Sequence, residues 1–301
     1  MTRTPAALLL AVLLSAVPVA TQMKLGAPPG DFVELDVVVV DKKQQPMQGL
    51  RQSDFTVKDD GKPVTLATFR EVRGPAPNDP DAGRTIVLLL DDTGVAPGGT
   101  QSIQLIARAF LESANRYDEV PVVRLHARDD EPYGDRIAGE ERIRAYRGGS
   151  YPFAYWSTAG EVLDRLTSLS KAVSSNSSKR KVLVCIGAGF VCNLSEPQSS
   201  SPLYFDKGWN AAVREAALAN MSVYGLVPGR AGTRAGALPD VTGGEVFTLG
   251  YNVGPAIDRI LRDASNYYVL GYWPVTEKKG LVRVEVQARV KGARVLARKL
   301  R

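Results

Sequence analysis

The chain has 301 residues, of which 44% are hydrophobic and 23% are charged, and this length suffices for one large globular domain or two smaller ones. Its formal net charge is +6, yet the Lys and Arg residues are scattered and form no continuous basic run. This charge pattern argues against nucleic-acid binding and is typical of a solvated cationic surface.

Residues 1–22 predict a secretory signal peptide. Arg3 precedes an apolar run from Ala6 to Leu14, and small residues then follow up to Ala20. The run is short for a membrane span, and no other window resembles a membrane helix. We therefore expect the mature chain to be exported, periplasmic or secreted, and without a membrane span. An uncleaved anchor is the alternative, because Pro18 lies close to the expected cleavage site.

Residues 31–73 predict β structure. The segment from Phe32 to Val40 is rich in β-branched residues, Asp60-Gly61 is a hairpin turn signal, and Val64 to Phe69 supplies another strand. A linker rich in Pro and Gly follows at residues 74–80, which makes this a domain boundary.

Residues 83–265 predict an α/β domain. Its strands are expected at Thr85–Leu90, Val120–Leu125, Lys181–Ile186 and Ser222–Val227, and its helices at Thr100–Arg116, from Thr158 onward, at Trp209–Ala219 and at Val253–Ala264. An antiparallel edge strand is expected within residues 133–146. Strands that alternate with helices indicate parallel βαβ units, and fully apolar strands indicate a sheet that is covered on both faces.

Residues 266–301 return to β structure. An aromatic strand at Tyr267–Trp273 precedes a segment in which apolar residues alternate with charged ones from Val282 to Val290. Neither terminal β segment has enough strands to bury a face alone. The predicted fold is therefore α/β, with a doubly wound, mostly parallel sheet inserted in a small β-sandwich that the N- and C-terminal strands form together.

The two cysteines, Cys185 and Cys192, are a candidate disulfide pair in an oxidising compartment. The alternative is that Cys185 simply packs within its apolar strand, since the sequence alone does not supply the geometry that a disulfide requires.

Several segments together resemble one known family. The first α/β strand ends in Asp91-Asp92-Thr93-Gly94-Val95, and a later one ends in Cys185-Ile186-Gly187-Ala188-Gly189. The motifs Thr242-Gly243-Gly244 and Tyr267-Tyr268-Val269-Leu270-Gly271-Tyr272 follow in order. This arrangement resembles the VWFA-related (von Willebrand factor type A) domain proteins of acidobacteria, over roughly Asp31 to Arg298.

The resemblance implies a metal-ion-dependent adhesion site for Mg²⁺ or Ca²⁺ at the carboxyl-terminal edge of the sheet. Carried over residue by residue, Asp91 matches the first acid, Thr93 supplies a first hydroxyl, and Ser150 is the nearest candidate for the second-loop hydroxyl. Val95 and Ala188 stand where the family has oxygen-bearing side chains. We therefore expect a degenerate site, and the alternative to metal binding is that Asp91 caps the following loop or helix.

Three enzyme motifs are incomplete. Asp92-Thr93-Gly94 occurs as a single aspartic-protease-like triplet, and Gly187 with Gly189 lacks the third glycine of a dinucleotide fingerprint. His126 is the only histidine, and no nucleophile-elbow pattern accompanies it. These patterns indicate that the protein is not an enzyme.

The predicted function is non-enzymatic binding or scaffolding of a protein partner or cell-surface ligand, without a cofactor. Recognition would use the loops at Asp91–Gly99, Arg147–Thr158 and Gly187–Ser201, the second of which carries aromatic residues. The alternatives are a Mg²⁺- or Ca²⁺-dependent adhesion protein and, third, a hydrolase.

Overall fold

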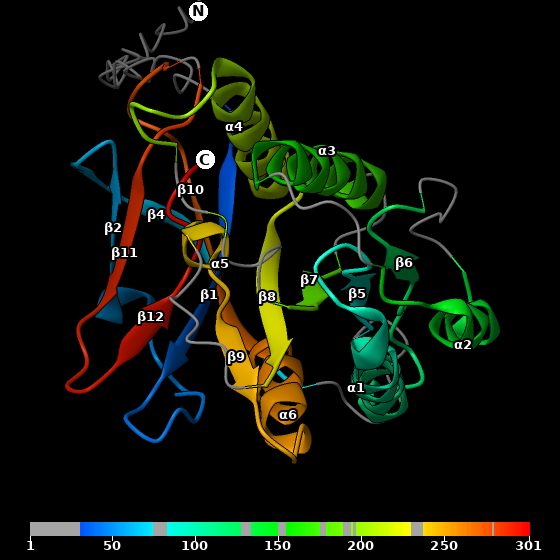
Figure 1. Cartoon of the computed structure of the whole chain (residues 1–301). Coiled ribbons are helices and arrows are strands. Elements are labelled where there is room, and N and C mark those ends of the chain that lie inside the picture. The colour runs from blue at the N-terminus through cyan, green and yellow to red at the C-terminus, as the bar shows by residue number, and fades with distance from the viewer. Residues whose placement is uncertain are drawn as a thin grey trace, which may run out of the picture.

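The structure is a computed structural model that describes residues 31–74, 83–127, 134–149, 155–174, 179–188, 194, 197–229, 237–278 and 280–301 (Figure 1). It contains one parallel sheet flanked by helices and two antiparallel sheets. The fold class expected from the sequence is confirmed. The predicted signal peptide, residues 1–22, lies outside the described residues.

Five strands form the parallel sheet, in the order β6-β5-β7-β8-β9. Their bounds are β5 Thr85–Leu90, β6 Val122–Arg124, β7 Lys181–Ile186, β8 Met221–Pro228 and β9 Val246–Leu249. Every residue of β5 and β7 is buried, as their continuous apolar sequences predict for strands covered on both faces. The chain passes from β6 across β5 to β7, so the direction of winding reverses between β5 and β7.

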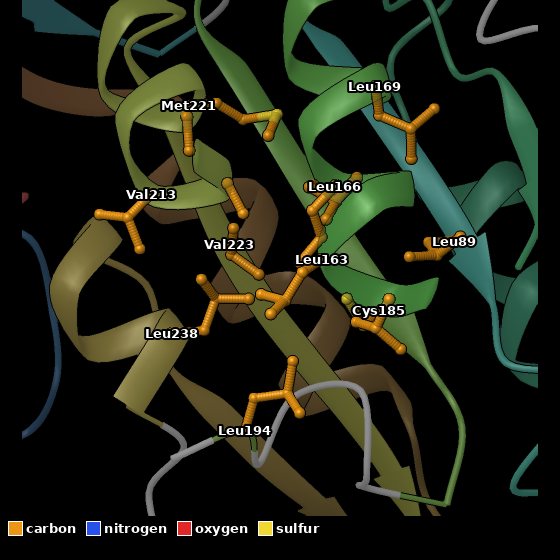
Figure 2. Packing of buried hydrophobic residues seen from close by; sticks show 14 of the residues in the cluster. Leu89, Leu163, Leu166, Leu169, Cys185, Leu194, Val213, Met221, Val223 and Leu238 are labelled. Carbon is orange, nitrogen blue, oxygen red and sulfur yellow. The ribbon is translucent and has the colours of Figure 1, made fainter. Parts of the chain in front are cut away.

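Helices cover both faces of this sheet. Their bounds are α1 Thr100–Ser113, α2 Arg136–Ala145, α3 Tyr155–Ser174, α4 Leu203–Leu218, α5 Ala237–Thr242 and α6 Gly254–Asp263, with a short 3₁₀ helix at Pro97–Gly99. Alternate residues of β5 pack toward opposite faces, since Leu89 belongs to the core beneath α3 and α4 while Leu88 belongs to the core beneath α1 and α6. Figure 2 shows the first core, with Leu163 and Leu166 of α3 facing Val223 of β8.

The N- and C-terminal strands pair with one another. The four-stranded antiparallel sheet has the order β12-β1-β10-β4, and the three-stranded sheet has the order β11-β2-β3. Their bounds are β1 Val33–Val40, β2 Phe55–Asp59, β3 Lys62–Val64, β4 Leu66–Arg73, β10 Asn266–Tyr272, β11 Val284–Ala288 and β12 Arg294–Leu296, with a 3₁₀ helix at Gln52–Asp54 before β2. Both sheets contribute to one core, in which the ring of Tyr268 lies 5.1 Å from that of Phe55.

Two arginines join the antiparallel sheets to the α/β part. Arg180, immediately before β7, donates to Asp36 of β1 at 2.5 Å and to Ser222 of β8 at 2.9 Å. Arg298, which follows β12, donates to the Ala217 carbonyl in α4 and to the Glu34 carbonyl in β1. The two parts therefore share a polar junction that neither could satisfy alone.

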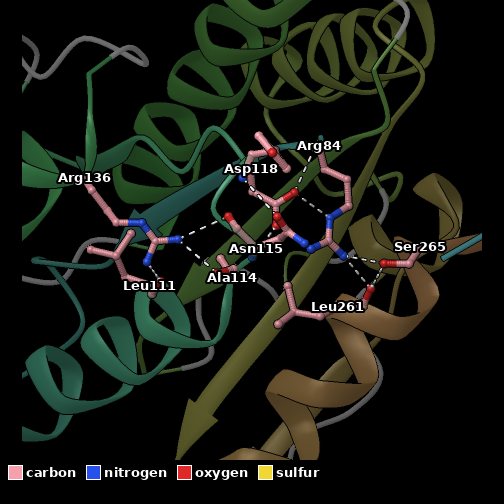
Figure 3. Close-up of polar contacts among 9 residues, drawn as sticks. Arg84, Leu111, Ala114, Asn115, Asp118, Arg136, Leu261 and Ser265 are labelled. Carbon is pink, nitrogen blue, oxygen red and sulfur yellow. Dashed lines mark hydrogen bonds and ion pairs between the residues drawn. The ribbon is translucent and has the colours of Figure 1, made fainter. Parts of the chain in front are cut away.

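The prediction of an antiparallel strand within residues 133–146 is wrong, because residues Arg136–Ala145 form α2. The Asp135 side chain accepts a hydrogen bond from the Ala138 N–H at 2.9 Å and caps the helix. Figure 3 shows the Arg136 guanidinium on the carbonyls of Leu111 and Ala114 at the end of α1. The Asp135 cap and the hydrogen bonds of Arg136 to the end of α1 therefore fix a helix whose own sequence carries little amphipathic pattern.

Some further elements differ from expectation. The fourth helix begins at Leu203, six residues before the expected Trp209, and Pro202 occupies its N-cap position. The strand β9 and the helix α5 were not expected at all. In the part of the chain that the structure describes, no helix has both the length and the apolar character that crossing a membrane requires.

Candidate functional site at the carboxyl edge of the parallel sheet

The loops after β5, β6 and β7 meet at one edge of the parallel sheet. The last residue of β5, Leu90, is in register with Arg124 of β6 and with Ile186 of β7. Asp91, His126 and Gly187 follow close behind these strand ends. Open α/β sheets bind ligands at this edge, where the direction of winding reverses, and here that point lies between β5 and β7.

Asp91 holds the loop that follows β5. Its side chain is buried, and its Oδ1 atom accepts hydrogen bonds from the Thr93 N–H at 3.0 Å, the Thr93 hydroxyl at 2.7 Å and the Gly94 N–H at 2.9 Å. The structure therefore brings Asp91 and Thr93 together in the arrangement of a loop cap. The other carboxylate oxygen, Oδ2, is buried and has no hydrogen-bond partner among the described residues.

Two glycines allow the backbone to approach Asp91. A Cβ atom at Gly187 would lie 2.2 Å from the Asp91 Cβ, and one at Gly94 would lie 2.9 Å from Asp91 Oδ2. The close approach to Asp91 explains the glycine at position 187, since any side chain there would displace one of the two loops.

The sequence did not predict Tyr146 as a residue of this site. It follows α2, is fully buried, and donates its hydroxyl hydrogen to the Asp91 carbonyl oxygen at 2.6 Å. Burial raises the pKa of the Tyr146 hydroxyl, and the nearby Asp91 carboxylate acts in the same direction, so the phenol remains a hydrogen-bond donor. No local pattern could reveal this contact, because 55 residues separate the two partners.

We expect Tyr146→Phe to lower the free energy of unfolding by about 1–3 kcal/mol, because it leaves the buried Asp91 carbonyl without its donor. Urea unfolding followed by circular dichroism measures the change. Tyr204→Phe is the matched control, since Tyr204 is 54% exposed. Equal stability of the two variants would show that the Tyr146 hydroxyl does not hold this loop.

A second carboxylate ties the β6 loop to the β5 loop. Asp92 Oδ1 accepts a hydrogen bond from the His126 backbone N–H at 3.0 Å and lies 3.7 Å from the His126 Nδ1 atom. The His126 Nε2 atom lies 3.3 Å from a carboxylate oxygen of Glu161 in α3. Burial raises the pKa of the Asp92 carboxyl, although the hydrogen bond from the His126 backbone opposes this shift. His126 therefore links three elements at the edge of the sheet.

The loop after α2 is joined to the same edge. The Gly148 N–H donates to the Thr100 hydroxyl at 3.0 Å, and the Gly149 N–H donates to the Asp92 carbonyl at 3.1 Å. A Cβ atom at Gly148 would lie 2.6 Å from the Val95 carbonyl oxygen. The aromatic part of this loop, residues 151–154, lies outside the described residues, as do the side chains of residues 155–158.

The described residues at this edge offer few oxygen ligands for a divalent cation. Val95 is buried in the apolar core, and Ala188 is exposed and supplies no side-chain oxygen. No cluster of three or more His, Cys, Asp or Glu residues suited to a metal ion occurs within the described ranges. Ser150 lies outside those ranges, so the metal set of Asp91, Thr93 and Ser150 stays a prediction.

The predicted disulfide also stays a prediction. Cys185 is buried within β7 and belongs to the core beneath α3 and α4. Cys192 lies outside the residues that the structure describes.

The fold and this edge define an α/β protein in which the loops at the carboxyl edge of the parallel sheet hydrogen-bond to one another. No protein-family model matches the chain, and no curated protein matches it.

Several solved structures are similar to the chain. One is an aerotolerance-related membrane protein from Bacteroides fragilis carrying multiple mutations to serine, with 12% identity and a TM-score of 0.40 over 60% of this chain and 98% of that one. Another is the conserved hypothetical protein BatB from Bacteroides thetaiotaomicron, with 13% identity and a TM-score of 0.37 over 61% and 98%. Proximal thread matrix protein 1 from the mussel byssus gives 12% identity and a TM-score of 0.39 over 71% and 49%. At these values the likeness carries no argument about function.

Proposed function

We propose that this chain is an exported, non-enzymatic binding or scaffolding protein of the VWFA-related type, whose carboxyl sheet edge recognises a protein partner or cell-surface ligand without a metal ion. The observation that carries the proposal is the loop network at the β5–β7 reversal point. Asp91, which the family resemblance implies as a metal-site acid, instead binds the loop groups of Thr93 and Gly94. Such hydrogen bonds hold the edge in a fixed shape, which favours recognition by a preformed surface.

The charged groups at this edge support a binding role over a catalytic one. Asp91 and Asp92 each accept backbone hydrogen bonds that fix a neighbouring loop, and His126 lies between two carboxylates on separate elements. The contacts of these groups connect the loops after β5 and β6 to each other and to α3. The proposal requires that the mature chain retains a specific envelope component in affinity capture, and a chain that retains none would contradict it.

A Mg²⁺- or Ca²⁺-dependent adhesion protein is the second candidate, and one observation favours it. The buried Asp91 Oδ2 atom has no hydrogen-bond partner among the described residues, and a buried carboxylate oxygen is costly unless something binds it. Binding of a metal ion to Asp91 Oδ2 therefore distinguishes the second candidate function from the first.

We expect millimolar Mg²⁺ or Ca²⁺ to raise the melting temperature of the mature chain by less than about 1 °C, because a ligand stabilises a protein only to the extent that it binds the native state. Differential scanning calorimetry with and without chelator measures the change. A rise of several degrees that disappears in Asp91→Ala would favour the metal-dependent alternative.

A further inference from the structure

A second candidate binding site lies away from the carboxyl sheet edge, where α4 and α5 meet the C-terminal segment. A cavity of about 630 Å³ opens there, which we call the α4 crevice. Its wall includes Asp206 and Trp209 of α4, Asp240 of α5, and Leu281, Arg283 and Leu300 of the C-terminal segment. This volume lies within the range of protein sites for small ligands.

Backbone hydrogen bonds fix the wall of the crevice. Val282 and Arg301 exchange N–H to carbonyl hydrogen bonds of 3.0 Å in both directions, and the Lys299 N–H donates to the Val241 carbonyl at 2.9 Å. The C-terminal segment therefore binds Val282, which precedes β11, on one side and α5 on the other. Because main-chain groups make these contacts, the crevice is largely formed before any ligand arrives.

The charges around the crevice leave one acid without a partner. Lys299 pairs with Asp240 at 2.5 Å, and Arg283 pairs with Glu285 at 3.3 Å. Asp206 forms no ion pair with any residue that the structure describes, and its buried Oδ1 atom has no hydrogen-bond partner among them. Among the charged residues of the crevice wall, Asp206 is therefore the acid without an ion-pair partner in the described part of the chain, and it is the group available to a positively charged ligand.

Apolar and aromatic surface adjoins this acid. Trp209 lies three residues after Asp206, so the two side chains share one face of α4. Leu281 and Leu300 line the same cavity from the opposite segment. Trp209 is 4% exposed, so it contributes apolar wall beside the carboxylate. A carboxylate next to apolar surface suits an organic cation, because the charge and the apolar body of such a ligand each find a partner.

We propose that the α4 crevice binds an ammonium group carried on an apolar or aromatic body, with Asp206 as its counter-ion and Trp209, Leu281 and Leu300 as its apolar surface. A free amine and the amino-terminal residue of a polypeptide both present this chemistry. The site is independent of the function proposed for the carboxyl sheet edge.

Isothermal titration of the full mature chain tests this site with four probes. These are 2-phenylethylamine, phenylalanyl-alanine amide, and the N-acetyl form of each. Saturable binding of either free amine, with affinity lower by about tenfold or more for its acetylated form, supports the proposal, because an ion pair to Asp206 needs the ammonium charge. Binding of the dipeptide alone assigns the site to polypeptide amino termini, and binding of both assigns it to amines in general.

Two variants locate the binding. Asp206→Asn removes the counter-ion, and Asn210→Lys adds a repelling charge at an exposed α4 position on the crevice wall, so each is expected to weaken binding about tenfold or more. Asp258→Asn and Gln101→Lys are matched controls at exposed positions of α6 and α1. The second crevice variant keeps the test decisive if the first does not fold. Failure of both free amines to bind at millimolar concentration, equal binding of acetylated probes, or unchanged affinity in the folded crevice variants would overturn the proposal.

Discussion

Replacing Asp36 with alanine is expected to lower the free energy of unfolding of the chain by about 3–5 kcal/mol. The Arg180 side chain is 2% exposed, and its two terminal nitrogens donate to Asp36 and Ser222 at the junction between the antiparallel sheets and the α/β part. Its buried Nε atom has no hydrogen-bond partner among the described residues. Without Asp36, a guanidinium charge would stay buried with one neutral hydroxyl partner. Such an uncompensated charge costs far more than the ion pair itself contributes.

Chemical unfolding monitored by tryptophan fluorescence and circular dichroism measures this effect. Glu34→Ala is the matched control, because Glu34 lies on the same strand with its side chain exposed. Coincident transitions with both probes would show that the junction makes the two parts one cooperative unit. A loss below about 1 kcal/mol for Asp36→Ala would contradict the role given to this ion pair.

Gly187→Ala is expected to destabilise the chain by about 1–3 kcal/mol and to abolish partner binding at the sheet edge. The new methyl group would lie 2.2 Å from the Asp91 Cβ atom, so one loop must move. Neither can move freely, because the Asp91 N–H donates to the Ile186 carbonyl at 2.9 Å and the Gly187 N–H donates to the Leu226 carbonyl at 3.2 Å. The displacement would therefore disturb the loop that Asp91 holds.

Gly250→Ala provides the matched control for this substitution. Gly250 follows β9 at the same end of the sheet, and a Cβ atom there would meet nothing within 4 Å. Thermal unfolding and affinity capture of both variants give the two readouts. If a folded Gly187→Ala protein captured as much of the partner as the unchanged chain does, the loops after β5 and β7 would not form the recognition surface.

The strands of the parallel sheet could be predicted because strands that are buried on both faces have a locally apolar sequence. Thr85–Leu90 and Lys181–Ile186 are apolar at nearly every position, and strands buried on both faces require this. The helix α2 could not be predicted in the same way. Its charged sequence has little periodicity, and contacts from Arg136 to the end of α1 fix its position. The edge strand β9 is short and partly exposed, so it carries a weak pattern.

The candidate site shows the same division between local and tertiary information. Asp91 and Thr93 are two residues apart, and their hydrogen bond follows from a local turn that the sequence could suggest. Tyr146 and Gly187 reach Asp91 only through the topology of the sheet. Residue types alone give no signal for such contacts, because each depends on which strands become neighbours.

We propose that the carboxyl sheet edge binds its partner without a divalent cation. Affinity capture from the native envelope, with the mature chain as bait and with or without chelator, tests it most directly. We predict that the same component is retained in equal amount under both conditions and is lost with Gly187→Ala. Loss of that component in chelator, with recovery when Mg²⁺ or Ca²⁺ is added back, would contradict the claim.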